Sequence, residues 1–301
     1  MGLKVNWLSY LDPQVYMGGG ERVGRELLVE AVRRGHVVRI SSVRWGKFSR
    51  LAGPRIQLHS SPDVWILTDI WNCPEQKQHF PQAILDVVLK SRRYVTLDNA
   101  WTTICCYPLF PCNGDVSMCS YSCIRFRARE VYLGARAQFF VSRLHRKLIE
   151  KTIGIYLQSA IEMPPTVDKT FFHNFGVKRD IPFLFVGTIV DYKGAIEVER
   201  RFGNIGLHWV GRNVTGRRLK GVHLGILNNF QLRDVYNRSQ YFVHLPEWNE
   251  PMGRSVIEAL LCGCQVILNE KVGAVGWGTT EDEIRALPNG ATVFWDSIEH
   301  C

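Results

Sequence analysis

The segment HLPEWNEPMGRSVIEALLCGCQVI (244–267) joins two predicted strands through a polar loop and a helix. The apolar run YFVHLP (241–246) predicts the first strand, and QVILNE (265–270) predicts the second. Between them, GRSVIEALLCG (253–263) has the apolar content and the closing glycine of a helix. Strand, helix and strand in this order are typical of a parallel α/β sheet.

The start of this helix is suited to bind an anion. Its first N–H groups have no intrahelical partner and carry a partial positive charge, which favours a phosphate. Gly253 lets the backbone approach a ligand closely. Glu258 lies among apolar residues, so its carboxylate needs a hydrogen-bonding partner, and ribose hydroxyls would supply one. The alternative interpretation is an ordinary amphipathic helix with two incidental glutamates, Glu250 and Glu258.

The same alternation of strand and helix recurs from the N-terminus onward. LKVNWLSYL (3–11) predicts a strand, ERVGRELLVEAVRRGH (21–36) a helix with Gly35 near its C-cap, and HVVRISSV (36–43) the next strand. Further strands are predicted at 63–69, 92–98, 137–143, 181–189 and 206–212, and further helices at 84–90, 143–152 and 232–239. The prolines Pro164 and Pro165 interrupt the alternation and predict a linker. We therefore expect two α/β domains, at 1–165 and 166–301, with a last helix that can pack back on the first domain.

Glu250 and Glu258 are separated by seven residues, and the stretch EPMGRSVIEALLCGCQVI resembles the E-x7-E signature of retaining GT-B glycosyltransferases of family four, the group 1 transferases. The resemblance implies two Rossmann-like domains that face each other across a cleft, with the donor domain at the C-terminus. It also implies that Glu250 contacts the transferred sugar and that Glu258 holds the ribose of the nucleotide. Met252 and Gly253, between the two glutamates, are expected to join them at the donor site.

A second match lies in FLFVGTIVDYKGA (183–195), which is similar to the first strand of the family's donor domain. Lys193 stands where the family has the lysine that binds the donor diphosphate, and a compact cation suits both the diphosphate and the charge on the leaving group. Thr188 replaces the arginine that usually follows the glycine, so one phosphate contact of the family is missing. Without the surrounding V-G-x5-K-G pattern, Lys193 would be interpreted as an ordinary surface lysine.

Two glycine-containing segments complete the expected donor site. GVHLGIL (221–227) resembles the segment after which the family contacts the nucleotide base, which makes Gly225 and Asn228 candidates for the base pocket. The loop before the first helix contains Gly19 and Gly20 and resembles the family's glycine loop, whose N–H groups approach the donor phosphates. The alternative interpretation of that loop is a tight turn between strand and helix.

Asp98 ends a predicted strand in TLDNAW (96–101), where the family often has His-Asp and an aromatic residue. Leu97 replaces the histidine that commonly contacts the donor sugar. Two interpretations of Asp98 stay open: it orients the acceptor hydroxyl or acts as a base, or it caps a turn.

Five of the nine cysteines lie between Cys105 and Cys123. Four thiolates in one loop suit a structural zinc ion, although the spacing is not that of a standard zinc ribbon. Buried free thiols and a loop disulfide are the alternatives. The expected zinc ligands are Cys106, Cys112, Cys119 and Cys123.

The charge of the 301-residue chain is unevenly distributed. The net charge is +9, and residues 1–180 hold 25 Lys and Arg against 15 Asp and Glu, whereas residues 181–301 hold 12 against 13. This asymmetry predicts that the N-terminal domain meets an anionic partner, such as DNA, an anionic membrane or a phosphorylated acceptor, or that it serves solubility alone. The chain has no apolar run long enough for a membrane span and no signal-peptide pattern at its start, which predicts a cytoplasmic protein.

Together these features predict a glycosyltransferase that uses a UDP- or GDP-sugar, retains the anomeric configuration and requires no catalytic divalent metal. The expected acceptor is a saccharide or a hydroxylated DNA base. The alternative is an inactive relative that binds a nucleotide sugar, which Thr188 and Leu97 suggest. An NAD-type Rossmann enzyme is disfavoured, because no G-x-G-x-x-G is followed by an acidic residue about 20 residues later.

Overall fold

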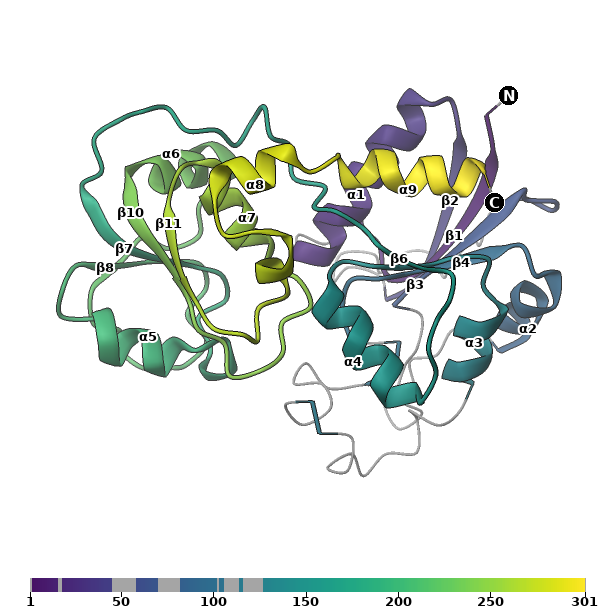
Figure 1. Ribbon diagram of the computed structural model, residues 1–301, viewed down its shortest axis with the longest axis horizontal. Coiled ribbons are helices and arrows are strands. Elements are labelled where there is room, and N and C mark those ends of the chain that lie inside the picture. Colours follow the sequence, from purple (N-terminus) through teal and green to yellow (C-terminus); the bar gives the residue numbers. More distant parts are fainter. Residues whose placement is uncertain are drawn as a thin grey trace, which may run out of the picture. The chain divides into compact units, whose positions relative to one another are not determined.

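The structure is a computed structural model that describes residues 2–15, 18–44, 58–69, 82–101, 103–105, 114–115 and 127–300. The chain divides into two compact units (Figure 1). The first unit comprises Met1–Thr166 and Pro288–Cys301, and the second comprises Val167–Leu287.

The first unit is built on a parallel sheet that has six strands within the described residues, in the order β2-β1-β3-β4-β5-β6. Every residue of β3 and β4 is buried, as expected for central strands that are covered by helices on both faces. The strands are β1 (Lys4–Leu11), β2 (Val37–Arg44), β3 (Val64–Thr68), β4 (Tyr94–Asp98), β5 (Gln138–Phe140) and β6 (Ala160–Glu162). The helices are α1 (Gly19–Arg33), α2 (Gln82–Ser91), α3 (Ala128–Gly134), α4 (Arg143–Ile153) and α9 (Gly290–Glu299).

Helix α1 follows the sequence pattern closely. Its buried residues Val23, Leu27 and Ala31 recur every four positions and form one apolar stripe. The helix ends where Gly35 adopts a φ of 75°, in the left-handed region that favours glycine. The predicted helix end at Gly35 is therefore confirmed.

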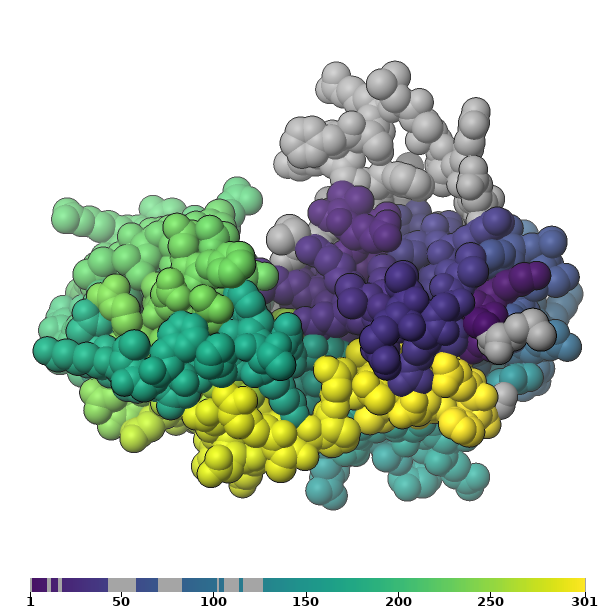
Figure 2. Space-filling view, turned by 90° about the horizontal axis from the view of Figure 1, so that it is seen from above, coloured from purple at the N-terminus to yellow at the C-terminus, as the bar shows by residue number. Residues whose placement is uncertain are grey.

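The C-terminal helix α9 packs against α1 within the first unit. Figure 2 shows the C-terminal residues in yellow against the purple surface of the N-terminal elements. The indole N–H of Trp295 donates to the carbonyl of Leu27 at 2.8 Å, and Arg34 forms ion pairs with Asp296 at 2.7 Å and Glu299 at 3.0 Å. These contacts attach the end of the chain to its first helix.

The second unit is a second parallel sheet, with five strands among the described residues in the order β11-β10-β7-β8-β9. Its main core packs α6 and α7 on the sheet around Leu184, Tyr236, Phe242 and Leu260. The strands are β7 (Ile181–Val186), β8 (Leu207–Val210), β9 (Val222–His223), β10 (Ser239–His244) and β11 (Gln265–Leu268). The helices are η4 (Asp191–Lys193), α5 (Ala195–Phe202), α6 (Asn229–Arg238), α7 (Arg254–Leu261), η5 (Gly273–Trp277) and α8 (Glu281–Ala286).

Each sheet has a switch point, at which the chain stops adding strands on one side of the first strand and adds the next strand on the other side. In the first unit the chain adds β2 on one side of β1 and β3 on the other, and in the second it adds β8 on one side of β7 and β10 on the other. Ligands of open α/β sheets bind outside the carboxyl ends of the strands at such switch points. In this protein the switch points lie at the ends of β1 and β3 and at the ends of β7 and β10.

Candidate functional site

At the switch point of the second unit, the loop after β10 brings Glu250 to the carboxyl end of the sheet. The loop is held by its backbone, because Glu250 N–H donates to the carbonyl of Lys271 at 2.8 Å and its own carbonyl accepts from Gly273 at 3.0 Å. Both partners follow β11 in the chain. Glu250 is therefore fixed at the sheet edge by the neighbouring segment.

The carboxylate of Glu250 has two partners from different elements. Its Oε1 lies 3.7 Å from Nζ of Lys193, and its Oε2 contacts Nε2 of His244, the last residue of β10. Burial alone would raise the pKa of Glu250, but the charge of Lys193 and the contact with His244 outweigh it and lower the pKa to about 2. Glu250 is thus a fixed anion at neutral pH.

Lys193 reaches this place because Gly194 follows it. A Cβ at Gly194, where φ is +84°, would lie 2.0 Å from the carbonyl oxygen of Leu245, so only glycine permits this approach to the loop after β10. The carbonyl of Tyr192 accepts from Glu247 N–H at 2.9 Å and joins the same two segments. The K-G pair of the sequence therefore has a structural reason, which is contact between η4 and the loop of Glu250.

Helix α7 begins at the end of that loop. Gly253 is its N-cap residue with a φ of 82°, and the carbonyl of Met252 accepts from Ala274 N–H at 2.6 Å. Glu258 is 2% exposed, and its two oxygens contact Nε of Arg254 at 2.8 Å and the hydroxyl of Tyr236 at 3.3 Å. The structure thus joins Glu250 to Lys193 and gives Glu258 a separate pair of partners.

The predicted base-pocket residues lie between β9 and α6. Gly225 has a φ of 75°, and its carbonyl accepts from Gly211 N–H at 2.7 Å, which ties it to the end of β8. Asn228 is the N-cap of α6, and its side chain accepts from Gln231 N–H at 3.0 Å. Asn228 therefore has a capping role in the free protein, and Gly225 supplies the turn before it.

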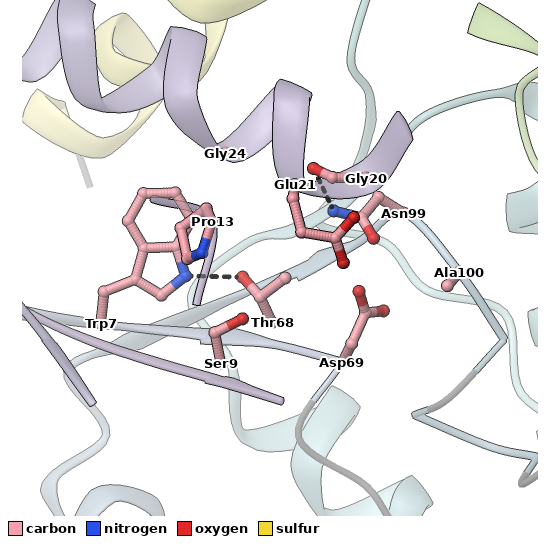
Figure 3. Close-up of a pocket in the computed structure, with 10 residues that line it drawn as sticks. All are labelled: Trp7, Ser9, Pro13, Gly20, Glu21, Gly24, Thr68, Asp69, Asn99 and Ala100. Atoms are coloured by element: carbon pink, nitrogen blue, oxygen red, sulfur yellow. Dashed lines mark hydrogen bonds between the residues drawn. The ribbon is translucent and has the colours of Figure 1, made fainter. Parts of the chain in front are cut away.

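At the switch point of the first unit there is a cavity of about 230 Å³ (Figure 3). It is formed by the ends of β1, β3 and β4 and by the first turns of α1. The carboxylates of Glu21 and Asp69 extend into it, as Figure 3 shows. Its lining residues are Trp7, Ser9, Pro13, Gly20, Glu21, Gly24, Thr68, Asp69, Asn99 and Ala100.

The glycine loop contributes to this cavity through Gly20. The amide of Asn99 donates to the carbonyl of Gly20 at 3.2 Å, and a Cβ at Gly20 would come within 2.6 Å of the Asn99 side chain. Gly19 is exposed, with open space where a Cβ would stand. Because Glu21 and Asp69 are negative, the cavity itself suits hydroxyl groups better than phosphate.

Asp98 is 1% exposed and is not among the residues that line the cavity. Its carboxylate accepts from the hydroxyl of Thr103, five residues later. Burial raises the pKa of Asp98 to about 7, although the hydroxyls of Thr103 and Tyr132 act in the opposite direction. The geometry fits the interpretation in which Asp98 stabilises a turn.

His244 is the site residue that the sequence analysis did not identify. Its only signal in the sequence is a histidine at the end of an otherwise apolar strand, two residues before Pro246. The proposed zinc ligands Cys106, Cys112, Cys119 and Cys123 lie outside the described residues. Within the described residues, no three or more His, Cys, Asp or Glu side chains are grouped so that they could hold a metal ion. No helix in that part of the chain combines the length and apolar character of a membrane span.

No protein-family model and no curated protein matches the sequence of this chain. HepE of Anabaena, solved in complex with UDP and glucose, is similar with a TM-score of 0.62 and 13% identity over 99% of this chain and 89% of that chain. WaaG, a glycosyltransferase involved in lipopolysaccharide biosynthesis, gives a TM-score of 0.58 and 14% identity over 98% and 94%. An alpha-glucosyltransferase in complex with UDP and a 13-mer DNA gives 0.54 and 11% over 99% and 90%.

These similar structures are GT-B glycosyltransferases with two Rossmann-like domains. The two parallel α/β sheets of this chain have the same fold, and the predicted fold class is confirmed. At 11–14% identity the comparison establishes the fold.

Proposed function

We propose that this protein is a glycosyltransferase that moves a sugar from a nucleoside-diphosphate sugar to an acceptor hydroxyl, with retention of the anomeric configuration. The observation that carries the proposal is the pair of Lys193 and Glu250 at the switch point of the second unit. The two residues are far apart in the sequence, and both match the glycosyltransferase pattern. Similar folds that bind UDP or UDP-glucose support a nucleotide-sugar donor.

Each donor group has a proposed partner in the second unit. The diphosphate is bound by Lys193 and by the first N–H groups of α7, which follow Gly253 in the chain. Glu250 accepts hydrogen bonds from hydroxyls of the transferred sugar, because an ionised carboxylate is an acceptor only. Glu258 holds the ribose, and Gly225 with the residues up to Asn228 forms one side of the base pocket.

Catalysis in this proposal depends on the departing diphosphate. Lys193 and the helix dipole of α7 stabilise the negative charge that develops on the leaving oxygen, so the proposed reaction uses protein charges and no divalent metal. Glu250 fixes the sugar so that the acceptor hydroxyl attacks from the face that retains the configuration. The bond from the anomeric carbon to the diphosphate breaks and the bond to the acceptor oxygen forms, while the proton of the acceptor hydroxyl passes to the departing diphosphate.

The acceptor is proposed to be a saccharide bound in the cavity of the first unit. Sugar hydroxyls can donate to the carboxylates of Asp69 and Glu21 and can exchange hydrogen bonds with the amide of Asn99. Trp7 supplies an apolar wall. A hydroxylated DNA base is the second acceptor class. It is favoured by the exposed cations Arg143, Lys147 and Lys151, which recur every four residues along α4.

An inactive relative that binds the nucleotide sugar is the second candidate function. The observation in its favour is that both oxygens of Glu258 already contact Arg254 and Tyr236, so that a ribose must compete for them. The presence of Thr188 where the family has an arginine also favours an inactive relative.

The test is incubation of the protein with a panel of UDP- and GDP-sugars and with acceptors that include oligosaccharides and hydroxymethylated DNA. Products are identified by mass, and the anomeric configuration is read by NMR. Sugar transfer or slow donor hydrolysis that disappears in Glu250→Gln supports the enzyme. Donor binding without turnover over the whole panel favours the inactive relative. Binding to DNA that falls steeply with added salt favours the DNA acceptor.

A further inference from the structure

His244 is a buried histidine in an apolar environment. Its side chain is 2% exposed, and its ring lies 5.9 Å from that of Phe185 and 6.3 Å from that of Phe242, measured between centroids. A polar ring is placed in such surroundings at a cost in solvation free energy, so the protein requires a compensating contact. Glu250 provides that contact.

The two ring nitrogens of His244 differ in their partners. Nε2 contacts Oε2 of Glu250, whereas Nδ1 has no hydrogen-bond partner among the described residues. With its proton on Nε2, the neutral ring donates to the carboxylate and leaves only a lone pair unpaired. Within the part of the chain that the structure describes, the one hydrogen bond of the buried ring is therefore the one from Nε2–H to Glu250.

We infer that His244 is a positioning residue for the proposed transfer: its Nε2–H holds one oxygen of Glu250 and leaves the other directed at Lys193 and the donor sugar. The inference rests on the proposed function of Glu250. His244 is the last residue of a strand inside the sheet, whereas Glu250 is on a loop. The histidine therefore holds the carboxylate in a fixed position relative to the sheet.

The other charged groups around Glu250 cannot replace this contact. Lys193 approaches the opposite oxygen, Oε1. Lys271 donates from Nζ to the carbonyl of Glu247 at 2.8 Å and is thus held by the backbone of the loop. Loss of the histidine donor would leave Oε2 without this partner, which raises the pKa of Glu250 and lets the carboxylate turn.

The experiment compares His244→Leu, which keeps apolar volume and removes the donor, with His244→Gln, which keeps an N–H donor. His208→Leu is the matched control, because His208 lies half-buried on β8, two strands away in the same sheet, with Nδ1 3.1 Å from the carbonyl of Gly206. The pH dependence of kcat/KM and the separate kcat and KM values for the nucleotide sugar are measured for all variants.

We expect His244→Leu to lower kcat/KM by roughly 10- to 100-fold, the range for a hydrogen bond to a charged group. Its activity should also fall at an acidic pH at which the wild type is still active, because protonated Glu250 cannot act as an acceptor. His244→Gln should restore most of the activity and the wild-type acid limb. A loss in His244→Leu that is the same at every pH, or equal losses in the leucine and glutamine variants, would indicate a packing role and overturn the inference.

A second measurement separates this inference from the proposed function. The pKa of Glu250 is followed by carbon-13 NMR in the free wild type and in His244→Leu, without any substrate. A rise of the pKa in the variant supports the positioning contact even if no donor in the panel is turned over. An unchanged pKa overturns it even if the protein is an active transferase.

Discussion

Asp98 in the first unit and Glu250 in the second are acids with little exposure to solvent, and their pKa values are shifted in opposite directions. Asp98 ends β4 in the first unit, and Glu250 follows β10 in the second. Burial raises the pKa of Asp98 to about 7, since its partners are hydroxyls. Burial has the same tendency at Glu250, yet Lys193 and His244 reverse it and bring the pKa to about 2.

The comparison shows that a charged partner can reverse the effect of burial on the pKa of an acid, whereas hydroxyl partners do not. Carboxyl groups whose surroundings shift their pKa values strongly often have functional roles. In this protein the fixed anion beside a cation is the group suited to a polar ligand. Asp98 is held under a turn, away from the lining of the cavity, and its protonation changes near neutral pH.

The largest expected effect is on activity and separates the two acids directly. Glu250→Gln removes the fixed charge while keeping the size of the side chain, and we expect kcat/KM for sugar transfer to fall by roughly 10²- to 10³-fold. Asp98→Asn should change it by less than about threefold, since Asp98 does not line the cavity. Steady-state kinetics with the best nucleotide sugar measure both.

Glu247→Gln is the control for Glu250, because Glu247 is exposed on the same loop. Wild-type kinetics in this variant would show that the loop tolerates the change from acid to amide. If Asp98→Asn lost as much activity as Glu250→Gln, the assignment of Asp98 to a turn would be wrong, and the base interpretation would return.

The next effect concerns the cation. Lys193→Ala should lower kcat/KM by roughly 10- to 10²-fold, because the diphosphate loses its point charge and Glu250 loses the partner that most lowers its pKa. Affinity for UDP alone, measured by calorimetry, should fall as well. Lys271→Ala is a suitable comparison, since Nζ of that lysine donates to the backbone carbonyl of Glu247 in the same loop. Equal losses in the two variants would contradict a specific diphosphate contact of Lys193.

The third effect is on stability. Asp98 binds its proton more tightly in the folded state, so wild-type stability should fall as pH rises from about 5 to about 7, by roughly 1.4 kcal/mol per pH unit at most. Asp98→Asn should remove this slope. Glu250 has the opposite sign, because its lowered pKa stabilises the fold above about pH 4.5, and that contribution is lost only as the pH falls toward 2. Urea denaturation at pH 5 and pH 7 measures the slope, and an unchanged slope in Asp98→Asn would refute the raised pKa.

Most of the fold could be predicted from the sequence, because the central strands and long helices have strong periodicity. The predicted strand at 92–98 and helix at 143–152 correspond to β4 and α4. The short strands β6 and β9, with three and two residues, carry too little pattern to be recognised. Helix α6 begins at Asn229, before the predicted start at 232, because Asn228 and Gln231 form a capping box there.

Only those residues of the candidate site that belong to a sequence motif could be predicted from the sequence. The V-G-x5-K-G pattern that ends at Lys193 and Gly194 predicts a ligand contact, and the structure adds that Gly194 permits the approach to Leu245. His244 could not be found in this way, because a histidine in an apolar strand has no meaning until its neighbours in space are known. The hydrogen bond that Asp98 accepts likewise comes from Thr103, in a turn whose geometry no periodicity describes.

The smallest expected effect probes that turn. Thr103→Val keeps the shape of the side chain and removes the hydroxyl that donates to Asp98, which should lower stability by about 1 kcal/mol. The loss should be greater at pH 8 than at pH 5, because the ionised carboxylate needs the donor more than the neutral acid does. Urea denaturation of wild type and variant at both pH values measures the difference, with Thr103→Ser as the control that restores the donor. A loss that does not depend on pH would mean that Thr103 stabilises the turn by packing, and that Asp98 is not the acid that titrates near neutral pH.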